Sequence, residues 1–177
     1  MFDKDVNISG KHGDYIRHLV AEFEGKCKFF KSGYDAYKNA PIIGFLFGRK
    51  ANKSSTKEGD TFTIFASQMS NIQDDLIFNY RLIMLLDAEH EPNFDERIQK
   101  AFNYYGDEIK SKKDKELFEQ YTLGGIEVLY EKLIDNASRQ DEYLLNLFSF
   151  VQDFHCRFNA KIEYSNFIEI TRGIQST

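Results

Sequence analysis

Residues 71–88 read NIQDDLIFNYRLIMLLDA and carry the strongest helical signal in the chain. Their apolar residues cover most of the helical circumference: Ile72, Leu76, Ile77, Tyr80, Ile83, Met84, Leu85 and Leu86. So wide an apolar surface is typical of a buried helix, whereas a surface helix carries one apolar stripe. We therefore predict that Asn71 to Ala88 forms the central helix of the fold.

Amphipathic helices are predicted on both sides of this segment. Two short stripes have helical spacing; they are Ile16, Leu19, Val20 and Phe23, and then Phe94, Ile98, Ala101, Phe102 and Tyr105. A longer stripe runs from Gln140 to Phe158, and we expect that helix to pack beside the central one. Capping pairs mark several helix starts. They are Ser32 with Asp35, Ser70 with Gln73, Asn93 with Glu96, and Ser138 with Asp141.

Proline and glycine interrupt two of the predicted helices. Pro41 is expected to kink or restart the helix that begins near Gly33, and Gly124-Gly125 is expected to bend the helix between Lys115 and Ile134. Gly44 and Gly48 have the spacing that lets two helix backbones approach closely, so we predict tight packing there.

The fold class that follows is all-α. We predict a single domain over residues 1–177, built as a bundle of five to seven helices with a mobile loop at about residues 51–60. Strand patterns are few. Thr61 to Phe65 alternates, and a minor β-hairpin near the C-terminus is suggested by residues 161–164 and 167–171.

Composition limits the class of protein. With 42% hydrophobic and 15% aromatic residues the chain has enough apolar material for a core. The charged start lacks the apolar region of a signal peptide, and the longest apolar run, Ala40 to Gly48, is far shorter than a membrane span. We expect a cytoplasmic protein with no membrane association. We also expect no cofactor.

Charge is distributed unevenly along the sequence. Residues 1–57 have a net charge of +5, and residues 58–177 have a net charge of −10. Basic residues in the N-terminal third are interleaved with aromatics, as in surfaces that bind phosphates and stack bases. The candidates for nucleic-acid or anion binding are Lys26, Lys28, Lys31, Arg49, Lys50 and Lys53. The alternative is that the aromatics are buried while the lysines extend to water, which agrees with the acidic pI of 5.4.

A set of histidines and carboxylates is a candidate metal site, because helical bundles hold metals with such residues. Its members are His18, Glu22, Asp87, His90 and His155. Ferritin-like sites need two Glu-x-x-His motifs, whereas this chain offers only Asp87-x-x-His90. His155 also lies on an apolar stripe, which favours a core or interface histidine.

Aromatic residues are more numerous than one small core needs, with 17 Phe and 10 Tyr. Aromatics left outside a core are enriched where proteins meet. The candidate interface residues are Phe29, Phe30, Tyr34, Tyr37, Phe45 and Phe47.

No catalytic dyad or nucleophile motif is present. We therefore predict a non-enzymatic interaction or accessory subunit of an intracellular complex, with a protein partner or a second copy bound. Two alternatives stay open. One is a nucleic-acid-associated accessory protein that uses the basic N-terminal third, and the other is a metal-dependent helical-bundle enzyme.

Overall fold

The structure, a computed structural model, describes residues 2–23, 27–53, 61–135, 137 and 139–158. The predicted C-terminal hairpin and most of the predicted loop at 51–60 lie outside these residues. The protein is mostly helical, with 65% helix and seven α-helices in the described part, as the all-α prediction requires. None of the described helices has the length and apolar character needed to cross a membrane.

The chain divides into two compact units, residues 1–136 and residues 137–177. The first unit contains β1 (Val6–Ile8), α1 (Lys11–Val20), α2 (Gly33–Leu46), β2 (Phe62–Ile64), α3 (Ala66–Asn71), α4 (Gln73–Leu86), α5 (Phe94–Ile98), the π-helical turn η1 (Gln99–Asn103) and α6 (Lys112–Leu133). The second unit contains α7 (Gln140–Phe158).

The small sheet of the described residues is N-terminal. β1 pairs with β2 in antiparallel register, with Val6 opposite Ile64 and Ile8 opposite Phe62. The predicted strand at 61–65 is therefore confirmed, but its partner comes from the start of the chain. The sequence prediction of a hairpin near the C-terminus missed this pairing because the two strands are separated by more than fifty residues.

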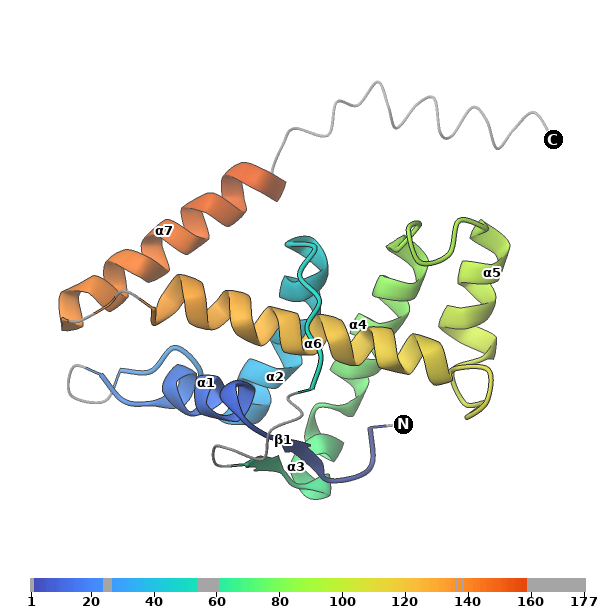
Figure 1. The fold of residues 1–177 in the computed structure, drawn as a ribbon, viewed down its shortest axis with the longest axis horizontal. Helices are drawn as coiled ribbons and strands as arrows, with labels where there is room; N and C mark the ends of the chain where they lie inside the picture. The colour runs from blue at the N-terminus through green and yellow to red at the C-terminus, as the bar shows by residue number, and fades with distance from the viewer. Residues whose placement is uncertain (1, 24–26, 54–60, 136, 138, 159–177) are drawn as a thin grey trace. The chain divides into compact units, whose positions relative to one another are not determined.

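α6 is the central helix of the first unit. Thirteen of its 22 residues are buried, against four of the 14 in α4. Figure 1 shows α6 crossing α2 and α4, and it also packs on α1. The prediction that residues 71–88 form the centre is therefore wrong. That segment is divided at Ile72 into α3 and α4, and part of its wide apolar surface faces outward.

Glycines allow α2 and α6 to touch backbone to backbone. A Cβ on Gly44 would collide with the carbonyl group of Tyr121, and a Cβ on Gly125 would collide with the carbonyl group of Ala40. Gly125 therefore provides a close contact within a continuous α6, where we had expected a bend. Pro41 likewise lies inside a continuous α2.

Gly48 has a different role from the predicted close packing. Its φ is +61°, and a Cβ there would meet no atom within 4 Å. It follows the end of α2 in the left-handed conformation that glycine adopts most easily. The amide of the next residue, Arg49, then donates to the carbonyl of Gly44 at 2.8 Å.

The predicted caps at Ser32 and Asn93 are confirmed, because their side chains accept from Asp35 N and from Asp95 N.

Candidate functional site

Half of the predicted basic residues are paired with carboxylates. The pairs are Lys28 Nζ with Glu22 Oε1 at 3.2 Å, Arg49 with both Glu131 oxygens at 3.0 and 3.2 Å, and Lys53 Nζ with Glu119 Oε1 at 2.7 Å. The last two join the loop after α2 to α6. These contacts offset the positive charge that a nucleic-acid surface would present.

The other three basic residues have different surroundings. Lys50 Nζ lies 4.9 Å from the centre of the Tyr121 ring, in a cation–π contact. Lys31 is exposed next to the Ser32 cap. Lys26 lies outside the described residues. Nucleic-acid binding stays a prediction.

A charge cluster around the buried Glu127 joins α1 to α6. Its Oε1 is 2.7 Å from Lys11 Nζ and 3.0 Å from Nε2 of the fully buried His12. Arg49 Nη1 lies 3.5 Å from the other oxygen, Oε2. An ionised carboxylate only accepts hydrogen bonds, so Nε2 of His12 carries the proton and donates to it. This cluster was absent from the sequence predictions, which did not consider His12.

The ionisable groups of this cluster shift each other's pKa values. Burial alone would raise the pKa of Glu127, but hydrogen bonds from Lys11 and His12 outweigh it and lower that pKa. The hydrogen bond between Lys11 and Glu127 raises the pKa of Lys11. Burial lowers the pKa of His12 below its ordinary value of 6.5, and the Glu127 carboxylate offsets only part of that effect. His12 is therefore neutral at pH 7.

Acid should destabilise the protein through His12. As pH falls through 6.5, His12 is protonated in the unfolded chain but stays neutral in the folded protein, where its pKa is lower. The free energy of unfolding therefore decreases. We expect this decrease in urea denaturation as pH falls through 6.5, and a smaller one in His12→Gln, which keeps an N–H donor for Glu127. Equal pH dependence in both proteins would contradict the assignment. Glu127 contributes separately, below its ordinary pKa of 4.5.

A cavity of about 80 Å³ lies beside His12 and is lined by several polar side chains. They include Ser9, Tyr37, Lys53, Glu119 and Thr122. This volume holds a few water molecules and is smaller than typical ligand pockets of about 300 Å³ or more. Nδ1 of His12 is the ring nitrogen left to accept a proton, but it is buried and has no partner among the described residues. The hydrogen bond between His12 and Glu127 joins α1 to α6.

Within the first unit, the predicted metal residues His18 and Glu22 contact other partners. His18 packs against the Tyr130 ring at 5.8 Å between centroids, and Glu22 pairs with Lys28. His155 belongs to the second unit, on α7. In the part of the chain that the structure describes, no three His, Cys, Asp or Glu side chains are grouped so that they could hold a metal ion. The metal-site hypothesis stays untested.

Asp87 and His90 instead hold the end of α4 against α6. Asp87 accepts hydrogen bonds from Tyr121 Oη at 2.7 Å and from His90 N at 3.0 Å. His90 Nε2 lies 2.8 Å from Oδ1 of the buried Asp114, and Lys100 Nζ lies 3.4 Å from the same oxygen. These carboxylate oxygens already have protein partners.

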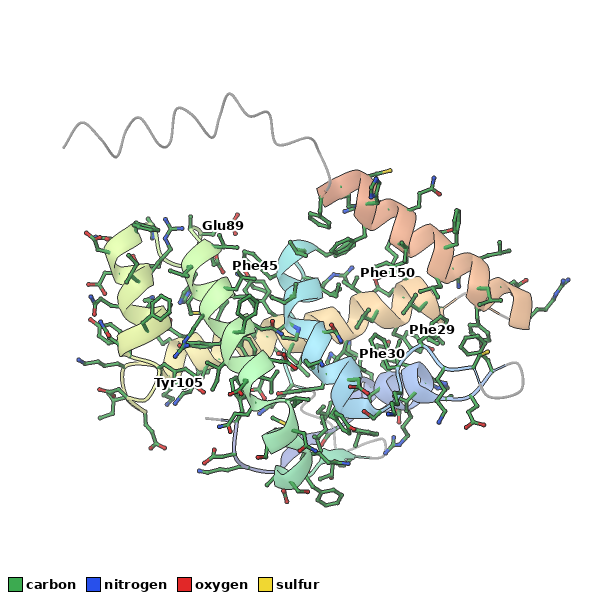
Figure 2. All side chains as sticks on the ribbon, turned by 180° about the vertical axis from the view of Figure 1, so that it is seen from behind. Phe29, Phe30, Phe45, Glu89, Tyr105 and Phe150 are labelled. Atoms are coloured by element: carbon green, nitrogen blue, oxygen red, sulfur yellow. The ribbon has the colours of Figure 1, made fainter. Side chains whose placement is uncertain are left out.

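The predicted interface aromatics are only partly accessible. Tyr37 is buried, and the rest are half-buried. Figure 2 labels Phe29 and Phe30 on the segment between α1 and α2, and Phe45 on the last turns of α2. Phe29 packs on Phe23 and Phe45 packs edge-on against Tyr121, with ring centroids 4.8 and 5.5 Å apart. These rings contribute mainly to packing within the chain.

Larger exposed apolar side chains lie on α4, α5 and η1. We define the α4–α5 face by Phe78, Leu86, Phe94 and Phe102, which are 64%, 55%, 58% and 50% exposed. α4 packs against both α5 and η1, so the four residues belong to adjoining elements. On α4, Phe78 lies opposite the buried Leu76, Tyr80 and Ile83. The eight-residue spacing of Phe78 and Leu86 could have suggested this second stripe.

Two arginines lie on the rings of this face. The guanidinium of Arg81 is 5.3 Å from the Phe102 ring, and that of Arg97 is 5.2 Å from the Phe94 ring. Arg97 also donates to the carbonyl of Leu85 at 3.0 Å. Among the described residues, neither guanidinium pairs with a carboxylate, and Nε of each has no hydrogen-bond partner. The face therefore combines exposed apolar rings with cations that have no anionic partner within the described chain.

Comparison of the chain with protein-family models, with curated proteins and with solved structures finds no match.

Proposed function

We propose that this protein is a non-enzymatic interaction subunit that binds a protein partner through the α4–α5 face. The observation that carries the proposal is the exposure of half or more of Phe78, Leu86, Phe94 and Phe102 on adjoining elements. Single exposed apolar residues are ordinary, but several together mark interaction sites. Phe and Arg are also enriched at protein interfaces, and this face presents both.

The partner that fits this face is an acidic amphipathic helix. Its apolar stripe would cover the four exposed side chains, as in other complexes that place a helix on an apolar surface. Its carboxylates would pair with Arg81 and Arg97, whose guanidinium groups are already held in place by the Phe rings and by the Leu85 carbonyl. Groups fixed before binding lose less conformational freedom when the complex forms.

Site-specific photo-crosslinking in the source cells tests the proposal. A photoreactive phenylalanine analogue at Phe78 is expected to give one dominant protein adduct. The same analogue at Ile109, which is 89% exposed but lies off the face, is the matched control and should not give it. A failure to crosslink at Phe78, or identical adducts from both positions, would contradict the proposal.

Charge reversal identifies the chemistry of the partner. Arg81→Glu together with Arg97→Glu is expected to reduce the Phe78 adduct at least about tenfold, because the partner's carboxylates would then meet like charges. Circular dichroism of the variant checks that the helices are retained. An adduct that persists at full yield in the folded variant would rule out an acidic partner.

A further inference from the structure

A larger groove adjoins the cavity beside His12. Its volume is about 430 Å³, and Val6, Tyr37 and Glu119 line both spaces. The cavity alone is smaller than a typical ligand pocket, but the groove falls within the usual range of about 300–1,000 Å³. The cavity and the groove together therefore have the size of a small-molecule site, with the cavity as its narrow inner end.

The cavity offers a hydrogen-bond acceptor and a donor. His12 lines it, whereas Glu127, which holds Nε2 of His12 at 3.0 Å, does not. Nδ1 is buried without a partner among the described residues, and it can only accept, because the ring proton is on Nε2. Tyr37 is buried beside the same cavity. Burial and the Glu119 charge raise the pKa of Tyr37, so its hydroxyl keeps its proton and can donate.

The groove adds an apolar floor and a rim of balanced charge. The floor is formed by Phe2, Val6, Tyr37 and Phe118, and the rings of Phe2 and Phe118 lie 5.5 Å apart between centroids. Glu119 is paired with Lys53 at 2.7 Å. The other charged residues of the described lining are two lysines and two glutamates, namely Lys112, Lys115, Glu108 and Glu116. Because these charges cancel, the groove favours a neutral ligand over an ion.

We propose that the cavity and the groove bind a neutral small molecule with an apolar body and a head group that both donates and accepts a hydrogen bond. The head group, a primary carboxamide or a hydroxyl, enters the cavity, donates to Nδ1 of His12 and accepts from the Tyr37 hydroxyl. The body covers the apolar floor of the groove. Binding satisfies a buried acceptor that is otherwise unpaired within the described chain. This proposal is independent of the α4–α5 face, which other elements form.

Titration of the full chain, labelled with ¹⁵N-histidine and followed by NMR, tests the site. Benzamide is expected to bind with a Kd of roughly 0.1–5 mM and to shift the Nδ1 resonance of His12. Acetophenone, which has a methyl group in place of the amide nitrogen, should bind at least about tenfold more weakly, because it leaves Nδ1 unpaired. Benzyl alcohol is the second probe, and the tighter of the two identifies the head group. If neither binds at about 20 mM, or if acetophenone binds as tightly, the proposal is overturned and water alone occupies the cavity.

Two conservative variants locate the head group. Tyr37→Phe removes the donor but keeps the ring, and His12→Gln removes Nδ1 but keeps a donor for Glu127. Each is expected to weaken the tighter probe about fivefold or more. Tyr15→Phe is the matched control, because Tyr15 stacks on Tyr130 and does not line the cavity, so its affinity should equal that of the wild type. Circular dichroism checks that each variant is folded. Unchanged affinity in folded Tyr37→Phe and His12→Gln, or equal weakening in the control, would overturn the proposal.

Discussion

Replacing Gly125 by alanine is expected to lower the free energy of unfolding by about 3 kcal/mol or more. The new Cβ would overlap the carbonyl group of Ala40 on α2, and backbone atoms of a helix cannot rotate aside as a side chain can. α2 and α6 would have to separate along their whole contact, which loosens the centre of the first unit. Urea denaturation followed by circular dichroism measures the change.

Two further alanine variants make this test specific. Gly106→Ala is the control, because a Cβ there meets no atom within 4 Å, and its effect should stay within about 0.5 kcal/mol.

Gly44→Ala introduces a Cβ on the opposite side of the same contact, against Tyr121. Once one alanine has separated the helices, the second should cost much less, so the double variant should be less destabilised than the sum of the singles. Strict additivity would show that the two glycines act independently.

Glu127→Ala is expected to destabilise the protein by about 2–4 kcal/mol. The substitution leaves Nε2 of the buried His12 without an acceptor and removes the carboxylate shared by Lys11 and Arg49. Urea denaturation near neutral pH measures it. Glu131→Ala, one turn away, is the control, because its pair with Arg49 is exposed and should contribute no more than about 1 kcal/mol. Equal losses in the two variants would contradict a central role for Glu127.

Local signals in the sequence predicted most of the helices. The bounds of α7 were predicted as observed, because its apolar spacing is local and regular. The Ser32 cap was also predicted, since a cap involves residues three apart. In contrast, residues 71–88 were placed at the centre because an apolar surface all round a helix indicates burial. Phe78 and Leu86 show that part of such a surface can face outward instead.

Features that depend on distant residues could not be predicted in the same way. A glycine pair can bend a helix or allow a second helix to pack closely against it, and which of the two occurs depends on the neighbouring element. At Gly125 the neighbour is Ala40 of α2. The sequence did not show that Arg49 and Lys53, in the basic N-terminal third, pair with Glu131 and Glu119, which lie 82 and 66 residues later in the chain. Charge counts along a sequence do not reveal such pairing.

The contact between Gly44 and Gly125 also has a consequence for synthesis on the ribosome. The two residues are 81 positions apart in the sequence. At roughly 5–20 residues per second, α2 leaves the ribosome about 4–16 seconds before the part of α6 on which it packs. During that interval the nascent α1 and α2 carry apolar faces with no finished surface to cover them. The first unit should therefore fold late in translation, and the emerging chain should be a substrate for chaperones that hold exposed apolar segments.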